Sequence, residues 1–204
     1  MQLRGLYAIT DDILTPAGTL LSQAETALRA GVRILQYRNK TDTDDAVEEI
    51  CVSLQKLCRR HGTLFIIDDR VRLARRICAD GLHIGKDDMD VSEARRLFPE
   101  GILGVSCYGS IRKALEAQEA GADYVAFGSF FPSPTKPASG IVSKSVLSRA
   151  KELLVLPVCA IGGIDTSNIH EIASHRPDMI SVVSAIWNGD IARNVKHLTQ
   201  GMNV

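Results

Sequence analysis

A short apolar run that directly follows a helical stretch recurs along the chain, and it limits the fold more than any other feature of the sequence. Four copies are AGVRILQYR from Ala30, ADGLHIGKDD from Ala79, AGADYVAFGS from Ala120 and RPDMISVVS from Arg176. In each copy the helical stretch ends at Gly or Asp, and the strand-like run ends in polar or small residues. This alternation is typical of repeated strand-helix units.

The repeat predicts an α/β fold, a single-domain (β/α)₈ TIM barrel over residues 1–204. Four further strand-like runs bring the count to eight, at 6–10, 64–68, 102–107 and 157–161. Helical patterns separate them, for example at 20–30, 43–60, 111–120 and 144–153. Eight units in 204 residues leave about 25 residues each, close to the minimum for a right-handed βαβ crossover. An open doubly wound sheet is the alternative, but no G-x-G-x-x-G follows the first strand.

Charge and composition narrow the classes of partner. The 24 basic and 24 acidic side chains give a formal net charge of zero, which argues against a nucleic-acid or acidic-membrane partner. No apolar segment follows a basic start, and no window reaches 18 uninterrupted apolar residues, so we expect no secretion signal and no membrane span. Any anionic ligand must therefore be bound by a local cluster of charge.

The cysteines indicate a reducing compartment. They are scattered, show no C-x-x-C spacing and lie mostly in apolar runs, at Cys51, Cys58, Cys78, Cys107 and Cys159. This usage suits small buried apolar side chains better than a disulfide framework. We expect a cytoplasmic protein. The sequence leaves the oligomeric state open, a homo-oligomer included.

The second strand-like run predicts an anion site at one rim of the barrel. Alternate strand residues face the barrel interior, and reactive groups lie at the carboxyl ends of the strands. On the inward face, Val32 and Ile34 are followed by Gln36, Arg38 and Lys40. Two positive charges on one face indicate an anionic ligand. The alternative is that both side chains have left the sheet for solvent.

Carboxylates end the next two strands. The third run ends in Asp68 and Asp69, and the fourth in Asp87 and Asp88. Adjacent strand ends would bring these oxygen ligands within reach of one cation. Mg²⁺ takes one or two carboxylates and fills its other positions with water and phosphate oxygens, so a metal-bound diphosphate fits. For Asp68 or Asp87, a helix N-cap is the alternative.

Hydroxyls and a third cation follow the fifth and sixth strands. The fifth run reaches Ser106, and the sixth ends at Gly128 before the segment SFFPSPTKP. Its Ser133, Thr135 and Lys136 stand between prolines, which predicts a preorganised anion clamp rather than an ordinary Pro-rich turn.

A second anion site is predicted after the last two strands. These strands end at Gly162 and Gly163 and at Ser184, and a short helix is expected over 185–188. In barrels of this kind, glycine backbone N–H groups and a short helix in these loops bind phosphate. Two separable anion sites indicate two phosphorylated substrates.

Three other features carry less weight. His83 has the opposite strand parity to Asp88, so we predict a structural histidine that packs toward the helices and not a base. Trp187 and the Phe130–Phe131 pair could line a pocket or pack in the core, and composition does not decide between these.

Taken together, the segments resemble the thiamine phosphate synthase family over nearly the whole chain. The matching segments, in the family's order and spacing, are LYAITDD, GVRILQYRNK, FIIDDR, GLHIGKDD, GVSCYGS, GADYVAFGSFFPSPTKP, AIGGI and SVVSAI. The resemblance implies that the nitrogen of a carboxythiazole or hydroxyethylthiazole phosphate displaces pyrophosphate from 4-amino-2-methyl-5-hydroxymethylpyrimidine diphosphate, with Mg²⁺ required. The aminopyrimidine can lose pyrophosphate as a stabilised cation, so no side-chain nucleophile is needed.

The resemblance also implies a role for individual residues. Those expected to hold the pyrimidine diphosphate are Gln36, Arg38, Asn39, Lys40, Asp68, Ser106 and Lys136, and the expected catalytic groups among them are Arg38, Lys40, Ser106 and Lys136. Those expected to bind the thiazole phosphate are Ser133, Pro134, Thr135, Gly163, Val183 and Ser184. The expected ligands of Mg²⁺ are Asp69 and Asp88.

The chain departs from the family pattern at two positions. Asp68 stands where Asn is usual, and Lys86 where Gln is usual. A carboxylate beside a diphosphate should weaken binding, and we expect Lys86 to compensate for its charge.

Two rival functions fit the sequence less well. A thiazole tautomerase of the same fold handles one phosphorylated thiazole and has no use for a metal-diphosphate site. A non-catalytic phosphate-binding barrel would be expected to have lost a metal ligand or the loop lysine, and this chain keeps Asp69, Asp88 and Lys136.

Overall fold

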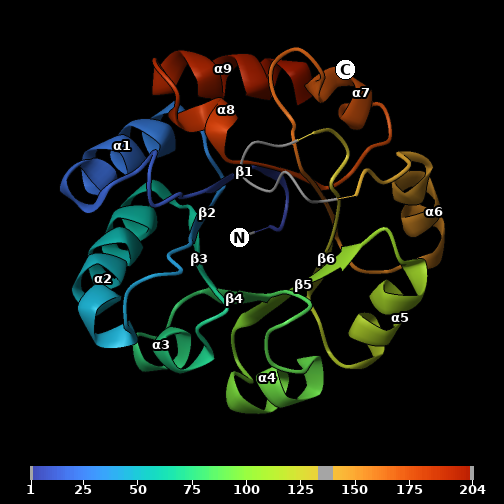
Figure 1. Ribbon diagram of the computed structural model, residues 1–204, viewed down its shortest axis with the longest axis horizontal. Helices are drawn as coiled ribbons and strands as arrows, with labels where there is room; N and C mark the ends of the chain where they lie inside the picture. The colour runs from blue at the N-terminus through green and yellow to red at the C-terminus, as the bar shows by residue number, and fades with distance from the viewer. Residues whose placement is uncertain (1, 133–139, 203–204) are drawn as a thin grey trace.

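The computed structural model describes residues 2–132 and 140–202, and these form a closed barrel of eight parallel strands surrounded by helices (Figure 1). Each strand pairs with its neighbour in chain order, and β8 closes the barrel on β1. The predicted (β/α)₈ fold is confirmed. The strands are β1 Gly5–Ile9, β2 Ile34–Tyr37, β3 Leu64–Asp68, β4 Gly81–Ile84, β5 Ile102–Tyr108, β6 Tyr124–Phe127, β7 Val158–Ile161 and β8 Met179–Val182.

Helices follow the strands and cover the outside of the barrel (Figure 1). Their ends follow local rules: the Thr43 hydroxyl accepts the Ala46 N–H at the start of α2, and Gly62 ends that helix with a left-handed φ of 64°. Among the described residues, no helix is long and apolar enough to span a membrane. The helices are α1 Ala17–Ala30, α2 Asp44–His61, α3 Val71–Arg76, α4 Val91–Leu97, α5 Ile111–Glu119, α6 Ser145–Leu153, α7 Ile169–Ala173, α8 Ser184–Trp187 and α9 Ile191–Met202.

The core between the strands and the helices contains the three aromatic residues that the sequence could not assign to either the pocket or the core. Trp187 is buried there, and its indole N–H donates to the carbonyl oxygen of Ile9 at 2.6 Å. Phe130 is buried in the same layer, and Phe131 is partly buried against it. Four cysteines are buried free thiols as predicted, whereas Cys78 is exposed. It follows α3 in a left-handed turn (φ 52°), which takes its side chain out of the core.

Side chains that point into the barrel are stacked in layers contributed by alternate strands, as expected for this fold. The strand registers place Tyr7, Ile66, Gly104 and Cys159 of the odd strands in one layer. The even strands supply the layer above it, which consists of Gln36, His83, Ala126 and Ser181. The odd strands supply the next layer, which consists of Ile9, Asp68, Ser106 and Ile161. The polar side chains therefore gather in the two layers nearest the carboxyl ends.

Candidate functional site

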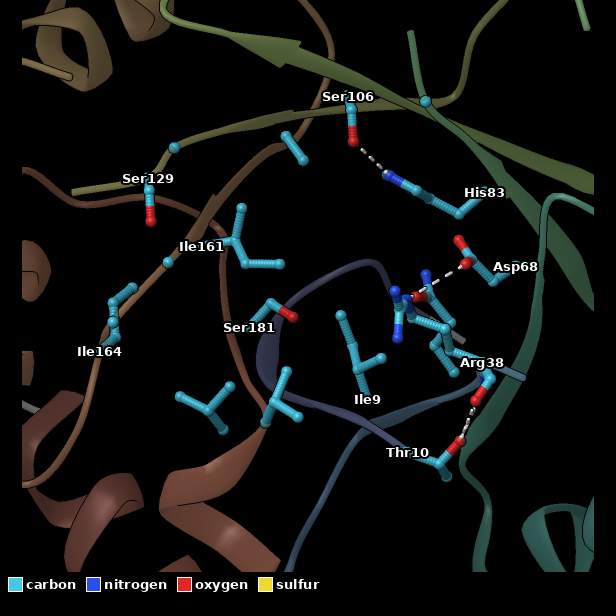
Figure 2. Close-up of a pocket in the computed structure, with 18 of the residues that line it drawn as sticks. Ile9, Thr10, Arg38, Asp68, His83, Ser106, Ser129, Ile161, Ile164 and Ser181 are labelled. Carbon is cyan, nitrogen blue, oxygen red and sulfur yellow. Dashed lines mark hydrogen bonds and ion pairs between the residues drawn. The ribbon is translucent and has the colours of Figure 1, made fainter. Parts of the chain in front are cut away.

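A pocket opens at the carboxyl ends of the strands, and residues from all eight strands or the loops after them line it (Figure 2). Its floor is the layer of Gln36, His83, Ala126 and Ser181, and its walls are Ile9, Asp68, Ser106 and Ile161. The predicted site residues that line it are Gln36, Arg38, Lys40, Asp68, Asp88, Ser106, Gly163, Val183 and Ser184. Four others, Ser133, Pro134, Thr135 and Lys136, lie outside the described residues.

Both predicted cations of the anion site line the pocket and form ion pairs there, although Lys40 is exposed. The Arg38 Nε atom lies 3.7 Å from Asp68 Oδ2, and the Lys40 Nζ atom lies 3.0 Å from the same oxygen. Lys40 also forms an ion pair with Asp69. Burial opposes the charge on Lys40, but its hydrogen bond to Asp69 and the charge of Asp68 outweigh this, and the pKa of Lys40 is raised. In this state the two cations are paired with carboxylates.

Asp88 lines the pocket, whereas Asp69 does not line it and is joined to it by its ion pair with Lys40. Asp69 follows β3 with a left-handed φ of 53°, and its N–H donates to the carbonyl of His83 on β4. Burial raises the pKa of Asp69, Lys40 opposes that rise, and the charges of Asp68 and Asp88 add to it. The Asp88 carboxylate accepts the N–H of Gly85 at 2.6 Å. The two predicted metal ligands therefore lie close enough to influence each other.

None of the four strand-end aspartates caps a helix. Arg70 precedes α3 without a side-chain cap, and the carboxylate that caps α4 belongs to Asp90. The capping alternative for Asp68 and Asp87 is therefore wrong. The side chain of Asp68 is instead committed to the two cations of the pocket.

His83 lies inside the barrel, and the prediction that it packs toward the helices is wrong. Its Nε2 lies 2.9 Å from Ser106 Oγ (Figure 2), and its Nδ1 lies 2.9 Å from the Tyr124 hydroxyl. The parity argument failed because β4 ends at Ile84, and the chain turns before it reaches Asp88. Alternation of side chains does not continue through a turn.

Two further predicted positions differ in detail. Asn39 lies outside the pocket, where its amide N–H groups donate to Asp12 and Asp42 at 2.9 and 2.8 Å and hold the loop after β2. Lys86 is exposed, and the contact described for it runs from its backbone N–H to the Tyr108 hydroxyl. Asp68 is thus balanced by Arg38 and Lys40, and the arrangement gives no support to compensation by Lys86.

Comparison with known sequences assigns the chain to a protein family. Residues 6–186 match the family model described as thiamine monophosphate synthase. The chain belongs to this family. It is 43% identical over 205 residues to the thiamine-phosphate synthase of Wolinella succinogenes, an alignment that covers 98% of this chain and 94% of the relative. It is 46% identical over 187 residues to that of Thioalkalivibrio sulfidiphilus, covering 91% and 89%.

A solved structure agrees with this assignment to the thiamine monophosphate synthase family. The thiamine phosphate pyrophosphorylase from Pyrococcus furiosus superposes with a TM-score of 0.90 at 34% sequence identity. The superposition covers 98% of this chain and 96% of that one. The barrel fold is therefore that of the family.

Two carboxylates, Asp69 and Asp88, are the candidate ligands for the Mg²⁺ ion that the sequence predicts. Across the described ranges, no group of three or more His, Cys, Asp or Glu side chains could hold a metal ion. Asp69 and Asp88 offer two hard oxygen donors instead, which is the number that Mg²⁺ usually takes from a protein when phosphate and water complete its shell. The donor set thus matches the expected ion only together with a substrate.

The second predicted anion site is built on tight packing between two loops. Gly163 has a left-handed φ of 65°, and a Cβ atom there would lie 2.4 Å from the carbonyl oxygen of Pro132. The short helix α8 begins at Ser184, one residue before the expected start. The glycine is therefore needed for backbone packing whether or not a phosphate is bound. A Gly163→Val substitution would therefore disturb the loop itself. Its effect on the two KM values would not show which of the two substrates binds at this loop.

Ser181 was missed by the sequence analysis, although it shares the inward parity of Val183. The residue is 2% exposed, and its hydroxyl has no hydrogen-bond partner within residues 2–132 and 140–202. Figure 2 shows this hydroxyl directed into the cavity.

Replacing Ser181 with Ala should raise the free energy of unfolding by about 1 kcal/mol, because a buried hydroxyl without a partner costs about that much. The matched control is Ser106→Ala, which removes a paired hydroxyl and should lower it. Urea denaturation of both variants measures this. A loss of stability in Ser181→Ala would show that the hydroxyl has a partner in the ligand-free protein.

Proposed function

We propose that this chain is a thiamine-phosphate synthase, a transferase that joins 4-amino-2-methyl-5-hydroxymethylpyrimidine diphosphate to a thiazole phosphate and releases pyrophosphate. The observation that carries the proposal is the pocket mouth, where Arg38 and Lys40 both pair with Asp68, Lys40 also pairs with Asp69, and Asp88 lines the same pocket. A tautomerase acting on one thiazole phosphate has no need of two cations and two carboxylates in one cluster. Membership of the thiamine monophosphate synthase family supports the same reaction.

In the proposed reaction, the bond between the pyrimidine methylene carbon and the diphosphate oxygen breaks, and the oxygen leaves with the electron pair. The thiazole nitrogen then forms the new carbon–nitrogen bond. Arg38 and Lys40 are placed to stabilise the departing negative charge. The apolar side chains of Ile9 and Ile161 keep the ring away from water while it carries positive charge. Holding both reactants in one pocket also accelerates the reaction, because it brings the thiazole nitrogen next to the methylene carbon.

The proposal assigns Mg²⁺ to Asp69 and Asp88. When bound, the ion would neutralise part of the diphosphate charge. Lys136 is proposed from the sequence as a third cation for the leaving group, and Ser133, Pro134 and Thr135 as contacts of the thiazole phosphate. The proposal places the reaction in the cytoplasm, where free thiols stay reduced.

Asp68 competes with the diphosphate for Arg38 and Lys40. Removing its charge should therefore strengthen binding of the pyrimidine diphosphate. Asp68→Asn should lower the KM for the pyrimidine diphosphate about threefold to tenfold, since a partly exposed ion pair is worth up to about 1 kcal/mol. The control is Asp45→Asn, an exposed carboxylate on α2 that pairs with Arg76 and lies away from the pocket. Steady-state kinetics with both substrates measure the effect, and a raised KM in Asp68→Asn would contradict the competition.

The function itself is tested by mixing the purified protein with both substrates and Mg²⁺. We expect release of pyrophosphate in step with formation of thiamine phosphate. Isomerisation of a thiazole phosphate without pyrophosphate release would favour the tautomerase. Binding of either phosphorylated compound without any turnover would favour a non-catalytic barrel.

A further inference from the structure

A chain of hydrogen bonds runs beneath the pocket and joins Gln36 on β2 to Ser106 on β5. Gln36 Nε2 donates to the Tyr7 hydroxyl at 2.8 Å, and the Tyr7 and Tyr124 hydroxyls are 2.9 Å apart. Tyr124 then meets His83 Nδ1, and His83 Nε2 meets Ser106, each at 2.9 Å. The resemblance assigns substrate contacts only to the two ends, Gln36 and Ser106. The three residues between them have no assigned role.

The two tyrosines are held in place by the layers of the barrel. Both are fully buried, and their rings meet edge to face with centroids 6.2 Å apart. A Cβ atom at Gly104 would lie 2.1 Å from the Tyr124 ring, so the absence of a side chain there makes room for the ring. Burial raises the pKa of Tyr7 and of Tyr124 well above the usual value. Each hydroxyl therefore keeps its single proton.

Counting the hydroxyl protons gives this chain of hydrogen bonds a direction. Because the Gln36 amide N–H donates to Tyr7, the Tyr7 oxygen acts as acceptor there. The one proton of Tyr7 is then available for its other partner, the Tyr124 oxygen. The proton of Tyr124 in turn goes to His83 Nδ1. With Gln36 as the donor to Tyr7, a Tyr124 hydroxyl that donated to Tyr7 would leave the buried Tyr7 proton without an acceptor in this chain of hydrogen bonds, at a cost in free energy.

We propose that this chain of hydrogen bonds fixes His83 as the tautomer protonated on Nε2, and thereby makes Ser106 a hydrogen-bond donor toward the ligand. His83 Nε2–H donates to the Ser106 oxygen, so the Ser106 proton points to the pocket that this side chain lines. Tyr7, Tyr124 and His83 are positioning residues that act through Ser106.

The two ends of the chain then offer a ligand complementary groups. Gln36 uses its amide nitrogen on Tyr7, which leaves its carbonyl oxygen as an acceptor at the pocket floor. Ser106 offers a donor from the wall of the pocket. A flat heterocycle with an amino group beside a ring nitrogen can satisfy both. The choice of an aminopyrimidine as this ring rests on the proposed function, whereas the tautomer of His83 does not.

The tautomer is measured directly by ¹⁵N NMR of the ligand-free, full-length protein labelled at its five histidines. The His83 signals are assigned by their loss in His83→Gln. We expect Nε2 to carry the proton and Nδ1 to be unprotonated at pH 8. A proton on Nδ1 would mean that the chain runs in the reverse direction and would overturn the proposal. Because no substrate is added, this result is independent of whether the protein makes thiamine phosphate.

Removing one hydrogen bond of this series tests whether its direction affects the function of Ser106. Tyr7→Phe removes the link to Gln36, so we expect a mixture of His83 tautomers and a loss of about tenfold in kcat/KM for the pyrimidine diphosphate, the effect of one misdirected hydrogen bond. Tyr37→Phe is the matched control, because Tyr37 is a buried tyrosine of β2 that packs in the outer core and not in this chain. It should leave the tautomer and the kinetics unchanged.

The double variant separates positioning from a general structural role. In a Ser106→Ala background, Tyr124→Phe should cost less than about twofold, because the donor that these hydrogen bonds orient is already absent, and the bond between Tyr7 and Gln36 is kept. A second loss of about tenfold in that background would overturn the proposal, since the tyrosine would then act independently of Ser106.

Discussion

Asp69→Asn and Asp88→Asn should each lower kcat/KM by about 100-fold or more, and the double variant should be little worse than the worse single. If the two carboxylates share one Mg²⁺ ion that also binds the diphosphate, they act as a unit, and such residues are not additive. Asparagine keeps the side-chain volume and the oxygen that accepts the Gly85 N–H, so the loop should remain in place. Removing one anionic ligand weakens Mg²⁺ binding directly.

Activity against Mg²⁺ concentration is measured for both single variants and for the double, with Mn²⁺ binding in the presence of pyrophosphate as a second readout. Asp87→Asn is the control, because this exposed neighbour does not line the pocket. Thermal melts should change little, since Arg70 and Asp90 occupy the helix starts. If the folded single variants keep the parent's dependence on Mg²⁺, this metal site does not exist.

The barrel could be predicted because its signal is repeated eight times and each copy is local. A short apolar strand after a helix needs no information from distant residues, so the strands 64–68 and 157–161 differ from the structure by at most one residue. The cations at the end of β2 were found in the same way, by parity within one strand. Gln36 and Arg38 point where the alternation of a regular strand places them.

The errors arise where that alternation stops. Counting back from Asp88 to His83 crosses the turn after β4 and gives the wrong face. Tyr108 also lines the pocket, and its parity with Ser106 on β5 was a signal that the sequence analysis did not use. For Ser181 the sequence also contained a signal. Ser181 is two residues before Val183 at the end of β8, and alternate strand residues face the same side.

Hydrogen bonds between distant strands were also beyond the sequence. Tyr7 and Tyr124 are 117 residues apart, and only the layering of the closed barrel brings their hydroxyls together. The pairing of Lys40 with Asp68 and Asp69 has the same origin. The sequence therefore identified which groups lie at the rim, but not which of them hold one another before a substrate arrives.

Lys40→Met should lower kcat by about 100-fold, because a charge that grows on the leaving diphosphate loses a stabilising cation worth roughly 3 kcal/mol. In the ligand-free protein the Lys40 ammonium pairs with Asp68 and Asp69, and it is partly exposed at the pocket mouth. It can therefore turn to a diphosphate without crossing the core. Lys56→Met, at an exposed position of α2, is the control.

A purely structural role for Lys40 makes a different prediction, and Asp68→Asn distinguishes the two. If the lysine only neutralises Asp68, removing that carboxylate should restore kcat in Lys40→Met to near the parent value, because no unpaired charge remains. If the lysine acts on the leaving group, the double variant should stay about 100-fold slow. Single-turnover rates at saturating concentrations of both substrates measure this step without interference from binding. Rescue by Asp68→Asn would remove Lys40 from the catalytic residues and leave Arg38 as the cation that meets the departing charge at this side of the pocket.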